Sequence, residues 1–169
     1  VNDWKNFKGG VRKAASNPKY CYNWAFVERN KVIVLNLWYS KIKELNGELF
    51  QEINMREDAE YFAQFAGKSV WSKRALEMDA AIQTAIKATL EVRIIICDGK
   101  IVREWNSSAK ASKVNKRMLD PVSWTIKKYN RQNGDCVLIR GAQKNNIVDQ
   151  FILEYEGSDL PKKKETKTS

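Results

Sequence analysis

Short apolar runs separated by polar turn dipeptides cover most of the chain. Three such dipeptides, Arg29-Asn30, Asp98-Gly99 and Asn133-Gly134, each stand between two apolar runs, and a fourth, Asn46-Gly47, precedes another. Asn-Gly and Asp-Gly tolerate the positive φ angles of tight hairpin turns, so the pattern predicts antiparallel hairpins. The expected strands are residues 22–27, 31–38, 49–53, 94–97, 101–102, 124–129, 136–140 and 148–155.

Three other segments favour helices. Residues 69–90 place apolar or small side chains on one stripe at helical spacing, which predicts a long helix with one face packed on a sheet. The stripe consists of Trp71, Ala75, Met78, Ile82, Ala85 and Thr89. Residues 56–66 predict a shorter helix. A first short helix is expected at residues 8–16, and it must end before Asn17-Pro18 because proline disfavours a helical residue before it.

These elements together predict an α+β fold. Residues 33–38 are apolar on both faces of a strand, so this strand should lie inside the sheet. About eight mostly antiparallel strands, with one long and two shorter helices, predict a strongly bent sheet or an open β-barrel. No internal repeat interrupts this pattern, and one domain over residues 1–156 accounts for it.

Charge sets the expected partner. The chain carries 30 Lys and Arg against 20 Asp and Glu, a net charge of +10, and it contains no histidine. Residues 157–169 supply only +2 of this charge and are expected to form a disordered basic tail or linker. The remaining surplus on the folded body favours a polyanion, and nucleic acid above all, as partner. The alternative is a basic protein that is merely soluble.

The three cysteines indicate reduced, buried thiols. Cys21, Cys97 and Cys136 each lie in an apolar run, their number is odd, and no pair has the spacing of metal ligands. We therefore expect a cytoplasmic protein without disulfides, metal or cofactor. No apolar stretch is long enough to span a membrane, and no signal peptide is recognisable. The first residue, Val1, and the lysine-rich end suggest a segment of a longer protein.

An aromatic run near the start is the candidate base-binding segment. In an extended strand, Tyr20, Tyr22, Trp24 and Phe26 share one side, and rings so arranged could stack a flipped or methylated base. The alternative is that most of these rings are core, and we expect this for Phe26. The candidate base-binding residues are Tyr20, Tyr22, Asn23, Trp24, Trp38 and Tyr39.

Residues 107–117 are the first candidate phosphate-binding segment. They combine cations with serines and contain no acid, and such hydroxyls and cations are what phosphate contacts use. The alternative is a solvated lysine-rich loop. Further cations follow on the next hairpin, near the start, and at the head of the long helix, whose N-terminus suits an anion. The candidate phosphate-binding residues are Arg12, Lys13, Lys68, Lys73, Arg74, Lys110, Ser112, Lys113, Lys116, Arg117, Lys127 and Lys128.

The sequence motifs that could form a catalytic site are weak. Without histidine, no Ser-His or Cys-His machinery can exist. Gly67-Lys68-Ser69 resembles the end of a nucleotide-binding loop, but position 62 is Phe62 and a predicted helix precedes it, so we reject this motif. Glu91, Asp98 and Lys100 leave open a metal-dependent nuclease built from carboxylates and lysine.

Four strings resemble the N-terminal halves of some HNH-type, modification-dependent restriction endonucleases. They are RKAASNP at residues 12–18, YCYNWAFVE at 20–28, GKSVWSKRA at 67–75 and ASKVNKRMLD at 111–120. The resemblance covers residues 4–141, and the histidines and cysteines of the HNH module are absent. It implies a sensor domain that reads a modified base in double-stranded DNA, while a fused or associated nuclease domain cuts.

The sequence thus predicts a DNA-binding domain, not an enzyme, that reads a methylated base in an aromatic recess. Three alternatives remain open: an RNA-binding module that uses the same cations and rings on single strands, a metal-dependent nuclease, and a protein-interaction domain indifferent to nucleic acid.

Overall fold

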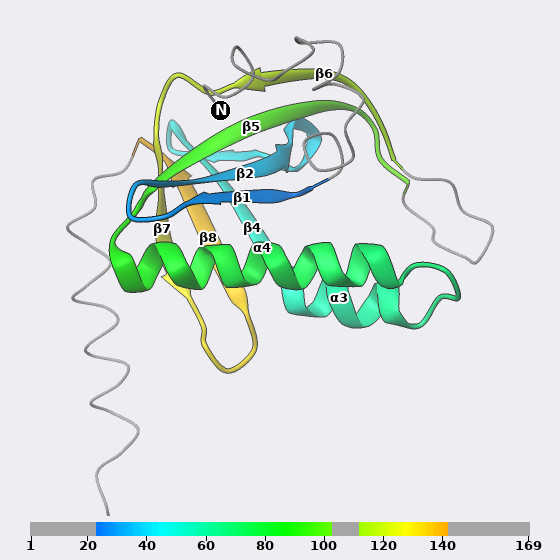
Figure 1. Ribbon diagram of the computed structural model, residues 1–169. Helices are drawn as coiled ribbons and strands as arrows, with labels where there is room; N and C mark the ends of the chain where they lie inside the picture. The colour runs from blue at the N-terminus through cyan, green and yellow to red at the C-terminus, as the bar shows by residue number, and fades with distance from the viewer. Residues whose placement is uncertain (1–22, 103–111, 142–169) are drawn as a thin grey trace, which may run out of the picture.

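The computed structural model describes residues 23–102 and 112–141, which form an α+β fold (Figure 1). Its elements, in chain order, are β1 (Ala25–Glu28), β2 (Val32–Trp38), the 3-10 helix η2 (Tyr39–Lys41), β3 (Lys43–Leu45), β4 (Glu48–Asn54), α3 (Met55–Ala63), α4 (Ser69–Ala88), β5 (Glu91–Lys100), β6 (Lys113–Leu119), β7 (Trp124–Tyr129) and β8 (Asp135–Arg140). The expected helix at 8–16 and strand at 148–155 lie outside the described residues.

The strands form one mixed sheet of eight strands, in the order β1-β2-β5-β7-β8-β4-β3, with β6 paired to the C-terminal part of β5. The prediction of a strongly bent sheet or open barrel is wrong, because the sheet is neither closed nor strongly curled. β2 pairs with β5 in parallel, whereas the other described strand pairs are antiparallel. A parallel neighbour needs a long crossover, here the segment from β3 to α4, and the described sheet stays open between its end strands β1 and β3.

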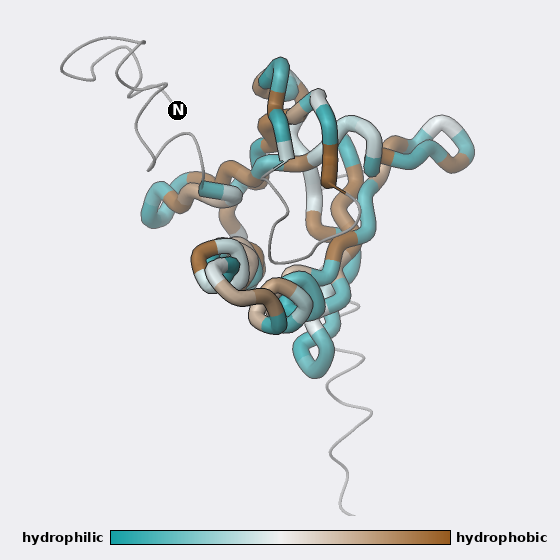
Figure 2. Tube along the Cα trace, turned by 90° about the vertical axis from the view of Figure 1, so that its right-hand side faces the viewer, coloured by the Kyte–Doolittle hydropathy of each residue, from teal (hydrophilic) through white to brown (hydrophobic). Residues whose placement is uncertain are grey.

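The two helices lie on one side of the sheet, as Figures 1 and 2 show. The predicted stripe of α4 is confirmed at its centre, where Ala75, Met78, Ile82 and Ala85 are buried. Met78, Ile82 and Ala85 pack with Leu35 and other sheet residues in the core cluster. β2 lies inside the sheet, as its apolar sequence predicted. Within the described segments, no helix combines the length and the apolar character that a membrane crossing requires.

The predicted hairpin turn at Asp98-Gly99 is wrong. β5 continues through both residues to Lys100, and the ladder with β6 shifts register between them, as at a β-bulge. Gly99 has φ +156°, and a Cβ on it would lie 2.0 Å from the carbonyl oxygen of Lys113. A glycine that permits close approach of two backbones looks, in sequence, like a glycine in a turn. Glycine at this position therefore allows β5 and β6 to approach closely and does not make a turn.

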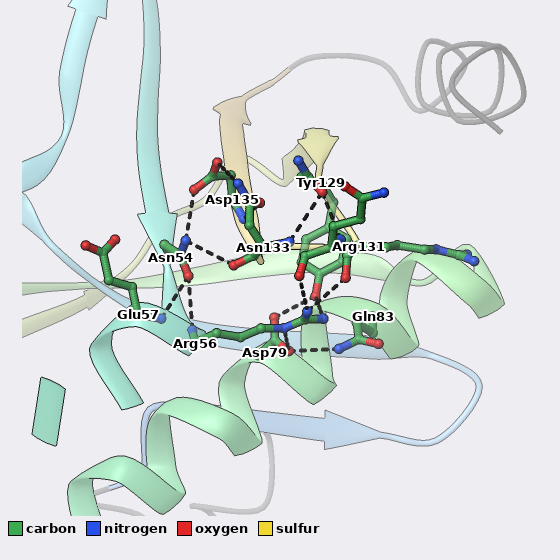
Figure 3. Close-up of polar contacts among 11 residues, drawn as sticks. Asn54, Arg56, Glu57, Asp79, Gln83, Tyr129, Arg131, Asn133 and Asp135 are labelled. Atoms are coloured by element: carbon green, nitrogen blue, oxygen red, sulfur yellow. Dashed lines mark hydrogen bonds and ion pairs between the residues drawn. The ribbon is translucent and has the colours of Figure 1, made fainter. Parts of the chain in front are cut away.

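A buried polar network fixes the β7–β8 hairpin to both helices (Figure 3). Asp79 on α4 is 5% exposed; it accepts from Arg56 Nε at 3.0 Å and from the Tyr129 hydroxyl at 2.6 Å. Arg56 also donates from Nη2 to the Tyr129 hydroxyl and from Nη1 to the carbonyl of Arg131, each at 2.8 Å. Asn54 caps α3 and donates to Asp135 Oδ1 at 2.9 Å. Because every partner comes from a different element, the network joins α3, α4 and the hairpin.

Tyr129→Phe is expected to destabilise the domain by about 1–3 kcal/mol, because it leaves buried Asp79 without one hydrogen-bond donor. Burial and the hydrogen bond to Asp79 raise the pKa of Tyr129 to about 12. This raised pKa contributes stability below about pH 10, and the contribution is lost as the pH rises toward 12. Urea unfolding at neutral pH and above pH 10 measures both effects. If wild type exceeds Tyr129→Phe in free energy of unfolding by the same amount at both pH values, the predicted loss of this contribution at high pH is contradicted.

Candidate nucleic-acid interface

The ends of β2 and β5 bring aromatic and cationic residues together. Because the two strands are parallel, their carboxyl ends lie at the same end of the sheet, with Trp38 in register with Cys97. Tyr39 follows Trp38 in η2, which contacts β5. Beyond Cys97, β5 ends with Lys100, whose register partner on β6 is Lys113. Residues from three separate stretches of sequence thus share one end of the sheet.

Four cations lie on the β5–β6 ladder, and we call three of them, Lys100, Lys113 and Lys116, the cationic cluster. The fourth, Arg117, directly follows Lys116 and so points to the opposite side of the strand. The bulge at Gly99 sets their register, so that Lys100 lies opposite Lys113 and Lys116 lies opposite Asp98. All four are exposed, and in β6 only Val114 is partly buried. β6 is therefore a surface strand that presents its basic side chains to solvent, and Figure 1 shows it next to β5, far from α4.

The three lysines of the cluster form no ion pair with an acid of the described segments, whereas several other exposed lysines do. Within residues 23–102 and 112–141, Lys31 pairs with Glu28 at 2.7 Å and Lys43 with Glu52 at 2.6 Å. No ion pair joins Lys100, Lys113 or Lys116 to an acid of those segments, although Asp98 lies in register with Lys116. Like charges directly opposite each other on an antiparallel ladder repel. The Lys100–Lys113 pair therefore leaves a site where an anion would lower the energy.

A row of three side chains crosses the sheet beside the cluster. Trp38, Cys97 and Arg117 are register partners on β2, β5 and β6. Leu37 belongs to the core on the helix side, so its neighbour Trp38 points to the opposite, helix-free side. Burial raises the pKa of the Cys97 thiol, while the nearby Arg117 opposes this rise. The thiol stays protonated at neutral pH and is 5% exposed, which indicates a structural role.

The other predicted phosphate-binding residues are divided between two separate places. Lys68, Lys73 and Arg74 lie at the start of α4, where the Lys68 ammonium is 4.2 Å from the centre of the Trp71 ring and Lys73 pairs with Glu77 at 3.9 Å. Lys127 and Lys128 lie on β7, and the Lys127 ammonium is 4.0 Å from Glu48. Figure 1 shows the β7–β8 hairpin extending past α4, away from β6. The predicted continuous basic strip is therefore not formed by these residues.

Ser112 has a local partner. Its Oγ accepts a hydrogen bond from the backbone nitrogen of Val102 at 3.0 Å, which ties the chain after β5 to the chain before β6. The hydroxyl can still donate to a phosphate oxygen. Arg12, Lys13 and Lys110, also predicted to bind phosphate, lie outside the described residues.

The predicted base-binding residues do not form one recess. Trp24 is half-buried on the helix side, with its ring edge-on to Phe62 at 5.8 Å between centroids, whereas Trp38 points to the helix-free side. Asn23 is half-buried, and its carbonyl accepts from Asn36 Nδ2 at 2.7 Å. Tyr39 is 64% exposed at the end of the sheet that carries the cationic cluster. Tyr20 and Tyr22 lie outside the described residues.

Phe26 was expected in the core, and the structure places it elsewhere. It is in register with Val34 and thus on the side opposite Ala25 and Leu35, which pack toward the helices. The expected alternation fails just before β1, because Trp24 and Ala25 both pack against the core cluster. The prediction extended the alternation of β1 to residues before its first residue, Ala25, and so assigned Trp24 and Phe26 to one face.

The candidate phosphate-binding residues predicted from the sequence do not include Lys100, which was considered only for a nuclease site. A nuclease site from Glu91 and Asp98 gains no support from their positions, since they lie seven residues apart along one strand. In the described part of the chain, no three His, Cys, Asp or Glu residues gather as a metal site would require. Only the bulge at Gly99 indicates that Lys100 belongs with the cations of β6, because the bulge places Lys100 opposite Lys113.

Comparison with known proteins returned no relationship: no family model, no curated protein and no solved structure matches the chain. Any functional conclusion therefore rests on the geometry described above.

Proposed function

We propose that this domain binds the phosphate backbone of nucleic acid, with double-stranded DNA as its target, through the cationic cluster. The observation that carries the proposal is the Lys100–Lys113 register pair, with Lys116 further along β6. Phosphates placed between these side chains would replace a repulsion with attraction and release counterions from the DNA. The net charge of +10 supports the same target by raising the rate of encounter with a polyanion.

The location on β6 also supports the proposal. An exposed strand that lies far from α4 can approach a duplex without displacing a helix. The hydroxyl of Ser112, just before β6, adds a neutral donor of the kind that phosphate contacts use. In this proposal the domain positions DNA and performs no chemistry on it.

Binding of a labelled DNA duplex, measured by fluorescence anisotropy over a series of salt concentrations, tests the proposal. Lys113→Ala is expected to weaken binding and to reduce the slope of log K against log salt by about 1, and the triple variant Lys100→Ala, Lys113→Ala, Lys116→Ala by about 3. Lys87→Ala is the matched control, since Lys87 is an exposed cation in the last turn of α4. Equal losses in Lys87→Ala and Lys113→Ala would show that only net charge matters, and would overturn the assignment to β6.

Recognition of a methylated base, as the sensor part of a restriction-type protein, is the finer form of this proposal and is supported by the sequence resemblance alone. Matched duplexes that are unmodified, methylated on adenine or methylated on cytosine test it. A preference of about tenfold for one of them is expected, since burying one methyl group contributes about 1 kcal/mol and stacking adds to it. Equal affinity for all three would reject the sensor role. Tighter binding to single-stranded RNA than to single-stranded DNA of the same sequence would favour the RNA-binding alternative.

A further inference from the structure

We propose that Tyr39 is a stacking platform for an unpaired nucleobase, an inference that rests on the proposed function and gives it a second subsite. Tyr39 is 64% exposed, the largest exposed fraction among the large hydrophobic side chains of the described residues. It lies in η2 immediately after Trp38, at the end of the sheet where β5 reaches Lys100. The ring therefore stands on the same end of the sheet as the cationic cluster.

Most of the other aromatic rings have aromatic or core partners. Around the α3–α4 junction, Trp24, Tyr61, Phe62, Phe65 and Trp71 pack edge-on against one another with centroid separations of 5.2–5.9 Å. Trp124 and Tyr129 are buried in the core. Among the described residues, Tyr39 takes part in no such ring pair, and its hydrogen bond with Ile42 uses the backbone carbonyl. The Tyr39 ring thus contributes to no aromatic packing in this part of the fold.

An exposed aromatic ring beside unneutralised lysines is the combination that single-stranded nucleic-acid sites use. The lysines hold the backbone, and the ring stacks on a base face, which every base provides. A base inside a duplex already stacks on both of its faces, so a protein ring reaches it only when the base is unpaired or extruded. The occupant that fits this end of the sheet is therefore a DNA strand with an unpaired base next to the phosphates held by Lys100 and Lys113.

Affinities for three DNA ligands test the inference: a fully paired duplex, the same duplex with one bulged base, and the single strand. The wild-type protein is expected to prefer the ligands with unpaired bases by about tenfold over the paired duplex. Tyr39→Ala should abolish this preference and leave the slope of affinity against salt unchanged, whereas Tyr39→Phe should retain the preference. Tyr61→Ala is the control, since Tyr61 is also an exposed tyrosine but lies on α3.

The outcomes separate the two proposals. Salt-dependent binding that is equal for all three ligands, or a preference that survives in Tyr39→Ala, would overturn the stacking role and leave phosphate binding by the cationic cluster intact. Absence of salt-dependent binding to every ligand would overturn the proposed function itself. Circular dichroism of each variant confirms that a loss of preference does not come from loss of folding.

Discussion

Replacing Gly99 with alanine is expected to lower the free energy of unfolding by about 2–4 kcal/mol. An alanine Cβ would lie 2.0 Å from the Lys113 carbonyl oxygen and 3.0 Å from the Asn115 nitrogen, and both atoms belong to the backbone of β6. A backbone atom cannot rotate away as the end of a flexible side chain can. Relief of the clash therefore requires β6 to separate from β5 or the bulge to rearrange. In either case, Lys100 and Lys113 lose their register, and DNA affinity should fall together with stability.

Gly47→Ala is the matched control for Gly99→Ala. Gly47 also has a positive φ, +81°, in the turn between β3 and β4, but a Cβ there meets no atom within 4 Å. This variant therefore carries conformational strain of about 1 kcal/mol without a clash. Urea unfolding of both variants isolates the cost of the clash. A difference below about 0.5 kcal/mol between the two would contradict the assignment of Gly99 as a position where no side chain fits.

Asp120→Asn is expected to destabilise the domain by about 1–3 kcal/mol, because the buried amide turns an N–H donor toward the donors of Arg140, Trp124 or Val122 and leaves hydrogen bonds unmade. Asp120 follows β6 and is 1% exposed. Its carboxylate accepts from Arg140 Nε at 2.7 Å and Nη2 at 3.0 Å, from Trp124 Nε1 at 2.8 Å and from the Val122 nitrogen at 3.0 Å. The carboxylate thus connects the chain between β6 and β7 to the core and to β8.

The same variant has an expected dependence on pH. Burial by itself would raise the pKa of Asp120, but the hydrogen bonds from Arg140, Trp124 and Val122 outweigh burial and lower the pKa to about 2. A carboxyl whose pKa is lowered by folding stabilises the fold above its unfolded pKa, about 4, and loses this contribution as the pH falls through 2. The stability difference between wild type and Asp120→Asn should therefore be full at pH 6 and shrink between about pH 4 and pH 2.

Glu44→Gln provides the control for Asp120→Asn, because it removes the same charge from an exposed position on β3. We expect it to change the free energy of unfolding by less than about 0.5 kcal/mol. Urea titrations at several pH values measure all three proteins. A constant difference between wild type and Asp120→Asn down to pH 2 would contradict the lowered pKa, whereas a small difference at pH 6 would contradict the role of the buried ion pair.

Much of the secondary structure follows from local pattern. The stripe of α4 predicted a helix from 69 to 90, and the helix runs from Ser69 to Ala88 before Thr89 adopts a left-handed conformation. The strand predictions at 31–38, 49–53, 124–129 and 136–140 agree with β2, β4, β7 and β8 within one residue. Helical spacing and turn dipeptides act over a few residues, so the amino-acid sequence is sufficient to reveal them.

The candidate site could be predicted only in part. The acid-free run around Lys113, Lys116 and Arg117 indicated candidate phosphate-binding cations, and the structure places them on an exposed strand. That Lys100 and Tyr39 lie at the same end of the sheet could not be predicted, because these residues come together through the parallel pairing of β2 with β5 and the bulge at Gly99. Conversely, Trp24 and Trp38 lie on opposite sides of the sheet, although the sequence predicted one recess for both.

By itself, the sequence determined the surplus of positive charge, the absence of imidazole chemistry and the positions of most helices and strands, since composition and local periodicity do not depend on chain contacts. Only the tertiary structure decided which strands are neighbours, which side of the sheet each ring faces and which lysines stand opposite each other. These properties depend on the crossover from β3 to α4 and on backbone contacts between residues far apart in the chain, such as Gly99 with Lys113. Long-range packing selects among pairings that local preferences leave equivalent.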